Sequence, residues 1–121
     1  MTIKINEKIP SVTLQYMDGS NVKNESTDEL FSGKKVALFA LPGAFTPTCS
    51  VSHLPGYVTK SDELLAKGVD LIVCLSVNDA FVMSAWGKQH KADDCVMMLA
   101  DGSGDFTQAV GLELDLTSNG M

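Results

Sequence analysis

Three runs of apolar residues constrain the fold of this 121-residue chain more than any other feature of its sequence. They span residues 36–41, residues 69–75, where Asp70 is the one interruption, and residues 96–100. A strand with one exposed face alternates apolar and polar residues, whereas a strand that is buried on both faces of a parallel sheet does not. We therefore expect three parallel strands in the interior of a sheet.

Segments with helical spacing separate these runs. Thr46 suits an N-cap and Pro47 suits the first helical position, so a helix should begin there. The proline-glycine pair at residues 55–56 interrupts the pattern, and we expect a short helix of about two turns, a kink, and a second helix that ends near Gly68. Apolar residues recur at helical spacing again through residues 78–90. Strands that alternate with helices predict an α/β fold with right-handed crossovers.

The segment before the first run predicts a hairpin and a single helical turn. Residues 13–17 have the character of a strand that enters a tight turn at Asp18 and Gly19, with residues 21–23 as the return strand. The order Ser-Thr-Asp-Glu at residues 26–29 is typical of a capping box. We expect these elements to precede the parallel strands.

The bulk composition excludes several classes of protein. Hydrophobic residues make up 45% and charged residues 20% of the chain, as in globular domains, and the length suits one domain over residues 1–121. No apolar run reaches the roughly 20 residues of a membrane helix, and the first ten residues lack the apolar core of a secretory signal. The net charge is −6, so we expect no nucleic-acid partner and no membrane partner.

The three cysteines indicate a reducing compartment. Cys49, Cys74 and Cys95 are an odd number with long spacings, and no C-x-x-C pair occurs. We expect the cytoplasm, or an organelle matrix if a transit peptide has been removed.

Cys49 is a candidate nucleophile because it falls in the first turn of the helix expected to begin at Thr46. A helix N-terminus can lower the pKa of a thiol from about 8.5 to roughly 3.5–7.5, so that the thiolate becomes the resting form. The same free N–H groups can bind an oxygen on which negative charge develops. From position alone, a reactive thiolate and a small buried hydrophobic residue are equally good interpretations.

A family resemblance favours the reactive thiolate. Residues 42–50, Pro-Gly-Ala-Phe-Thr-Pro-Thr-Cys-Ser, contain the P-x-x-x-T-x-x-C signature of peroxiredoxins. The complete sequence of this segment resembles the type II, atypical two-cysteine (peroxiredoxin-5-like) branch. The resemblance extends through residues 53–57, 76–83, 85–88 and 99–104, and so covers nearly the whole chain.

This resemblance implies a thioredoxin fold and a thiol-specific peroxidase that needs no cofactor. Cys49 would be the peroxidatic cysteine, Thr46 would position the peroxide oxygens, and Pro42 would shield the thiolate from water. Hydrogen peroxide or an alkyl hydroperoxide would convert Cys49 to a sulfenic acid, and thioredoxin or glutaredoxin would recycle the enzyme.

Cys74 is the candidate resolving cysteine. In plant and bacterial members of the branch that cysteine lies on the strand after the crossover helix, where Cys74 is expected. Neighbouring strands lie about 4.8 Å apart, and both cysteines should lie near the same edge of the sheet, while a disulfide requires Cα atoms within about 7 Å. A buried strand residue remains the alternative for Cys74, and we expect Cys95 to be structural.

The two histidines and an aromatic group are weaker candidates. His53 could tune the Cys49 thiolate, or it could be a surface or capping residue. With His53 and His90 alone and no cysteine pair at ligand spacing, we expect no metal. Phe81, Met83 and Trp86 fit a core cluster, and could also form the rim of a homodimer face.

One departure from the family pattern concerns the end of the chain. The family supplies an arginine from a later segment, followed by two strands and a helix, whereas this sequence has no arginine and no counterpart of those elements. One of the two strands would pair with residues 36–41, which would otherwise have a bare edge. We expect either that the chain is truncated or that a partner chain completes the sheet.

Two other functions compete with the peroxidase. The missing arginine favours a peroxiredoxin-like redox sensor or interaction module with little turnover. A disulfide oxidoreductase of the thioredoxin type would share the fold but requires C-x-x-C, and Thr46 stands where the first cysteine would be.

Overall fold

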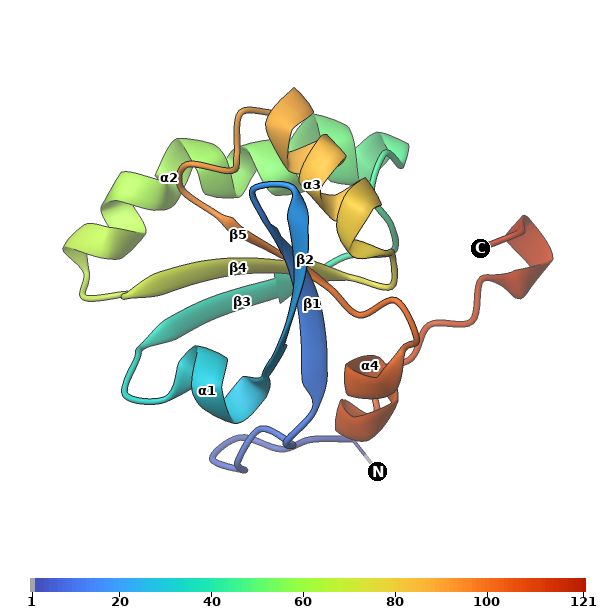
Figure 1. Ribbon diagram of the computed structural model, residues 1–121, viewed down its shortest axis with the longest axis horizontal. Helices are drawn as coiled ribbons and strands as arrows, with labels where there is room; N and C mark the ends of the chain where they lie inside the picture. The colour runs from blue at the N-terminus through green and yellow to red at the C-terminus, as the bar shows by residue number, and fades with distance from the viewer. Residues whose placement is uncertain (1) are drawn as a thin grey trace.

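The computed structural model describes residues 2–121 (Figure 1). The strands are β1 (Thr13–Asp18), β2 (Asn21–Ser26), β3 (Val36–Ala40), β4 (Leu71–Ser76) and β5 (Met97–Ala100). The helices are α1 (Thr27–Phe31), α2 (Leu54–Ala66), α3 (Ala80–Gln89) and α4 (Asp105–Val110), with a π-helical segment η1 (Cys49–His53) and a 3-10 turn η2 (Thr117–Asn119). Within residues 2–121 the strands form a five-stranded sheet in the order β2-β1-β5-β4-β3, which confirms the expected α/β fold.

The three apolar runs form the parallel part of this sheet. β4 pairs in parallel with β3 on one side and with β5 on the other, so that Phe39, Cys74 and Met98 lie in one row across the strands. This arrangement confirms the parallel strands that were predicted from the unbroken apolar pattern.

Helices cover both faces of the sheet, α2 and α3 on one face and α1 and α4 on the other (Figure 1). The first face packs Phe39, Cys74 and Met98 against Leu54 and Trp86. Alternate strand residues point to the opposite face and form a second cluster with α1 and α4, which contains Leu14, Leu30, Val73, Leu75, Leu99, Phe106 and Val110. Because both faces are covered, a polar residue at these strand positions would lose its contact with water.

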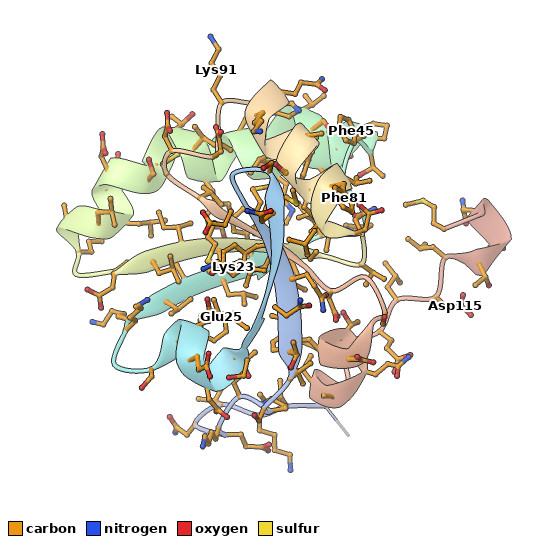
Figure 2. The ribbon with its side chains drawn as sticks, viewed as in Figure 1. Lys23, Glu25, Phe45, Phe81, Lys91 and Asp115 are labelled. Carbon is orange, nitrogen blue, oxygen red and sulfur yellow. The ribbon has the colours of Figure 1, made fainter. Side chains whose placement is uncertain are left out.

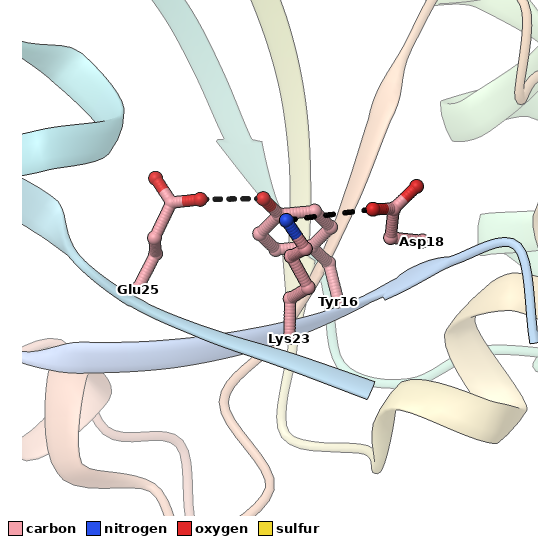
Figure 3. Close-up of polar contacts among 4 residues, drawn as sticks. All are labelled: Tyr16, Asp18, Lys23 and Glu25. Carbon is pink, nitrogen blue, oxygen red and sulfur yellow. Dashed lines mark hydrogen bonds and ion pairs between the residues drawn. The ribbon is translucent and has the colours of Figure 1, made fainter. Parts of the chain in front are cut away.

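The N-terminal hairpin is fixed by polar contacts on one of its faces. Tyr16 pairs directly with Lys23 across the two strands. The Tyr16 hydroxyl donates to Glu25 at 2.5 Å, and Lys23 forms an ion pair with Asp18 at 3.5 Å (Figure 3). The hydrogen bond to Glu25, together with burial and nearby negative charge, raises the pKa of Tyr16 to about 12. These contacts fix the register of the predicted hairpin, and β1 joins the sheet by an antiparallel contact with β5.

The predicted division into two separate helices at residues 55–56 is wrong. Helical structure runs without a break from Pro47 to Ala66, and the π-helical segment η1 lies within it, directly before Pro55. Pro55 occupies the first turn of α2, where the missing N–H of a proline costs little. The chain therefore accommodates the proline by a local change of helix type and not by a break.

Side-chain caps set the starts of two other helices. The Ser26 hydroxyl accepts a hydrogen bond from the Glu29 N–H at 3.2 Å, as the capping pattern predicts. Asp79 caps α3 through the Val82 N–H at 2.8 Å, so α3 begins slightly later than expected. Helix α4 was not predicted. Its first turn is held by Asp101, which accepts from the N–H groups of Phe106 at 3.1 Å and Thr107 at 2.8 Å.

β3 is an edge strand within the described part of the chain, with β4 as its one neighbour. This position agrees with the edge that was expected from the sequence. None of the helices in residues 2–121 has the length and apolar character needed to cross a membrane.

Candidate functional site

Cys49 lies in the first turn of the helix that follows β3, as predicted. The Thr46 hydroxyl donates to the Gly43 carbonyl at 2.6 Å and closes a tight turn. Phe45 has a φ of 63°, a conformation that is uncommon for a residue with a side chain, and lets the chain reverse toward the helix. The Ser50 N–H then donates to the Thr46 carbonyl at 2.9 Å, which is the first hydrogen bond of the helix.

The start of the helix offers free donors beside Cys49. Pro47 has no N–H, and within residues 2–121 the N–H groups of Thr48 and Cys49 find no hydrogen-bond partner. Free N–H groups at a helix N-terminus stabilise negative charge. The site can therefore hold an anionic sulfur or an oxygen that gains charge during a reaction.

A π-helical segment carries Cys49 into α2. The Leu54 N–H donates to the Cys49 carbonyl, which is a bond between residues five apart in place of the usual four. Such segments are rare and occur often at functional sites. The wider turn makes this part of the helix less regular than the rest of α2.

Cys49 and Cys74 come together in the core cluster between the sheet and the α2–α3 layer. Cys49 is 4% exposed, Cys74 is 0% exposed, and both are free thiols. Burial, and to a smaller extent the negative charge of Cys49, raises the pKa of Cys74 to about 12. Cys74 therefore keeps its proton at neutral pH.

Pro42 and Thr46 line a hollow of about 670 Å³ at the carboxyl edge of the sheet, and Cys49 does not line it. The side-chain amide of Asn78 stabilises the residues that line this hollow. Asn78 accepts through Oδ1 from the Ala44 N–H at 3.0 Å and from the Ser76 hydroxyl at 2.7 Å. These polar residues were not predicted from the sequence as site residues, although a serine and an asparagine at the carboxyl end of a buried strand are a usable signal.

A side-chain hydrogen bond of Ser50 was likewise not predicted from the sequence. The Trp86 indole N–H donates to the Ser50 hydroxyl at 3.0 Å, across 36 positions of the chain. Trp86 is fully buried, and the Phe45 ring lies 6.4 Å from its ring. Neither a motif nor a helical period connects these two polar atoms, so no sequence signal could have found the pair.

Phe81 is not a core residue, contrary to one of the two interpretations. It is 64% exposed, whereas Met83 and Trp86 are fully buried as predicted. Figure 2 shows Phe81 in the first turn of α3. The homodimer face stays a prediction.

Within residues 2–121, no hydrogen bond joins the side chain of His53 or of Cys95 to the Cys49 thiol. The His53 ring packs against the rings of Phe39 at 5.2 Å and Tyr57 at 5.9 Å. Cys95 precedes β5 and therefore lies at the other edge of the sheet, where its thiol is 3.6 Å from the Ala92 carbonyl. In the described residues no group of three or more His, Cys, Asp and Glu side chains is arranged to hold a metal ion.

Comparison with known proteins gives consistent relatives. The family model described as Redoxin matches residues 4–121. Peroxiredoxin-2E, chloroplastic, from Arabidopsis thaliana is 54% identical over 95% of this chain and 50% of that protein, and Peroxiredoxin-2D from the same plant is 48% identical over 98% and 74%. The chain thus spans half of the first relative and about three quarters of the second.

A solved structure shares both fold and sequence with this chain. Reduced Prx3 from Vibrio vulnificus, crystallised in complex with hydrogen peroxide, superposes with a TM-score of 0.92 at 52% identity. The match covers 95% of this chain and 72% of that one.

Proposed function

The chain belongs to the redoxin family, and within it to the peroxiredoxins of type II, and we propose that it is a thiol-dependent peroxidase that acts through Cys49. The observation that carries the proposal is the position of Cys49 in the first turn of a helix with free N–H groups beside it. The Vibrio vulnificus relative that was crystallised with hydrogen peroxide supports the choice of substrate.

The first step is a displacement at oxygen. The Cys49 thiolate attacks one peroxide oxygen, the O–O bond breaks, and the other oxygen leaves with the electron pair and takes up a proton as water or an alcohol. The sulfur becomes a sulfenic acid, and is thus oxidised by two electrons while the peroxide is reduced by two. The free N–H groups stabilise the charge that develops on the leaving oxygen.

Thr46 is proposed to orient the peroxide. The Thr46 hydroxyl donates its hydrogen bond to the Gly43 carbonyl. The lone pairs of the hydroxyl oxygen therefore remain free to accept a hydrogen bond from the substrate. Pro42 lines the same hollow as Thr46. Its proposed role, the exclusion of water from one side of the reacting sulfur, rests on the family resemblance of residues 42–50. Both residues are thereby proposed for substrate positioning.

The second step joins Cys49 to Cys74. The Cys74 sulfur attacks the Cys49 sulfenic acid, a disulfide forms, and the hydroxyl leaves with the Cys74 proton as water. Burial is the main cause that raises the pKa of Cys74 to about 12, and the negative charge of Cys49 is the smaller cause. The smaller contribution disappears once Cys49 is a neutral sulfenic acid. Oxidation of Cys49 thus favours the thiolate of Cys74 that resolves it.

The disulfide is returned to two thiols by an external dithiol, for which we propose thioredoxin or glutaredoxin. Two thiols of the reductant lose two electrons and two protons, which restore Cys49 and Cys74. For location we propose the cytoplasm or an organelle matrix. The names of the relatives include chloroplastic forms, which supports the second choice.

Trapping of the sulfenic acid tests the proposal. The reduced protein is treated with one equivalent of hydrogen peroxide in the presence of dimedone, and its peptides are mapped by mass spectrometry. The expected result is a dimedone adduct on Cys49, with no adduct on Cys95. If Cys49 forms the adduct but a separate sample without dimedone fails to consume further peroxide with excess dithiothreitol, the low-turnover redox sensor is the better description.

A further inference from the structure

The hydrogen bond between Ser50 and Trp86 lies directly behind the proposed nucleophile. Ser50 follows Cys49 in the chain, and its N–H forms the first hydrogen bond of the helix. Its hydroxyl accepts the Trp86 indole N–H at 3.0 Å. The first turn is therefore tied at one residue both to its own helix and to α3.

Loss of this bond is costly because of where Trp86 lies. The indole is fully buried among core residues of the α2–α3 layer, and the Ser50 hydroxyl is the partner of its N–H. A buried N–H that loses its acceptor without gaining water costs more than an exposed hydrogen bond would. The penalty applies to the closed turn and disappears when the turn opens and water reaches the indole.

We propose that Ser50 and Trp86 are positioning residues that form a latch, the hydrogen bond between them, which holds the Cys49 turn closed. Cys49 is 4% exposed in the closed turn. A reagent as large as iodoacetamide therefore reaches the Cys49 sulfur when the turn opens. The segment that opens is the π-helical η1 with the residues before it, which is the irregular part of the helix. Opening breaks the latch, and closing restores it.

Alkylation of reduced protein tests the latch without peroxide. Iodoacetamide reacts with the Cys49 sulfur, which displaces iodide, and the rate at each cysteine is followed by peptide mapping. Ser50→Ala removes the acceptor, and we expect Cys49 to react about fivefold faster or more, with Cys95 as the internal reference. Ser50→Thr keeps the hydroxyl and should bring the rate back toward that of the parent.

Ser52→Ala is the matched control for helix propensity. Ser52 is an exposed serine of the same segment, and no hydrogen bond of its side chain is found within residues 2–121. Alanine favours helix over serine, so propensity alone would close the turn and slow the reaction in both variants. Acceleration in Ser50→Ala together with no acceleration in Ser52→Ala is therefore specific to the latch.

The indole gives a direct readout of the bond. Trp86 is the single tryptophan of the chain, so its N–H gives one resonance in an NMR spectrum. We expect exchange of this proton with water to speed up in Ser50→Ala, while amides of β4 and β5 keep their protection. In the Trp86→Phe background, Ser50→Ala should change Cys49 alkylation by less than about twofold, since the bond is already gone.

Two results would overturn the latch: an unchanged Cys49 alkylation rate in Ser50→Ala, or an equal loss of protection throughout β4 and β5. The consequence for catalysis, faster disulfide formation and less sulfinic acid in Ser50→Ala, rests on the proposed function. The alkylation and exchange measurements do not rest on it, so a protein that fails to consume peroxide can still support or refute the latch.

Discussion

Cys49 and Cys74 lie in one core cluster, and the negative charge of Cys49 adds to the effect of burial in raising the pKa of Cys74 to about 12. Cys74 is thereby held as a protonated thiol that does not compete for the peroxide. The smaller, charge-dependent part of this effect disappears when Cys49 is oxidised, because a sulfenic acid carries no charge. The raised pKa of Cys74 thus fits the proposed order of steps, in which peroxide first oxidises Cys49 and Cys74 then attacks the sulfenic acid.

The pairing predicts which disulfide forms. After treatment of the reduced protein with one equivalent of peroxide, peptide mapping should find a bond between Cys49 and Cys74 within one chain. Cys95→Ala should leave this product unchanged, since Cys95 lies at the other edge of the sheet. Cys49 found solely as sulfinic acid or as a mixed disulfide would mean that Cys74 is a buried strand residue with no part in resolution.

Thr46→Val should slow the attack on peroxide by about tenfold to a hundredfold, because the shape of the side chain stays and the hydrogen bond to the substrate is lost. The rate of Cys49 oxidation, followed by stopped-flow fluorescence of the single tryptophan, measures the effect. Thr48→Val is the control, since Thr48 is an exposed threonine of the same turn. Equal rates for the Thr46 variant and the parent would reduce Thr46 to a residue of the tight turn.

The raised pKa of Cys74 predicts a loss of stability at alkaline pH. Above pH 9 the unfolded chain releases the Cys74 proton, whereas the folded chain retains it up to about pH 12, so folding becomes less favourable as pH rises. Between pH 9 and 10 the free energy of unfolding should fall by about 1 kcal/mol more in the parent than in Cys74→Ala, and the contribution of Tyr16 cancels because both proteins contain it. Urea denaturation under reducing conditions measures this difference. A parallel pH dependence in the two proteins would refute the assignment.

Two glycine substitutions test the packing of the helices that enclose the site. A Cβ at Gly87 would lie 2.8 Å from Cγ of Met98, so Gly87→Ala should force α3 away from β5 and destabilise the fold by about 1–3 kcal/mol. Gly56 in α2 has open space at that position, and Gly56→Ala should stabilise the fold by about 0.5–1 kcal/mol. Urea denaturation compares the two variants, and a change of the same sign in both would contradict the packing.

The sequence predicted those features that depend on local pattern. The unbroken apolar runs predicted β3, β4 and β5, and the order of Thr46 and Pro47 predicted the helix start that carries Cys49. The π-helical segment before Pro55 was missed, because a proline signals a break and does not reveal how neighbouring turns can absorb it.

Contacts between distant residues were beyond such patterns. The hydrogen bond from Trp86 to Ser50 joins α3 and η1, which come together because both cover the same face of the sheet, and neither residue indicates the other in the sequence. The antiparallel contact of β1 with β5 has the same origin, since it depends on where the hairpin docks. The motif therefore predicted Pro42, Thr46 and Cys49 as site residues. The tertiary contacts of Asn78 and Trp86 beside them could be seen in the structure alone.

The most direct test of the account compares peroxide consumption by the parent and by Cys49→Ser, with dithiothreitol as the reductant and Cys95→Ser as the matched control. Serine has nearly the same shape, but its hydroxyl is hardly ionised at neutral pH, so the fold should remain and the nucleophile should be lost. We predict sustained consumption by the parent and by Cys95→Ser, and a rate in Cys49→Ser equal to that of dithiothreitol alone. Consumption by Cys49→Ser at the rate of the parent would contradict the account.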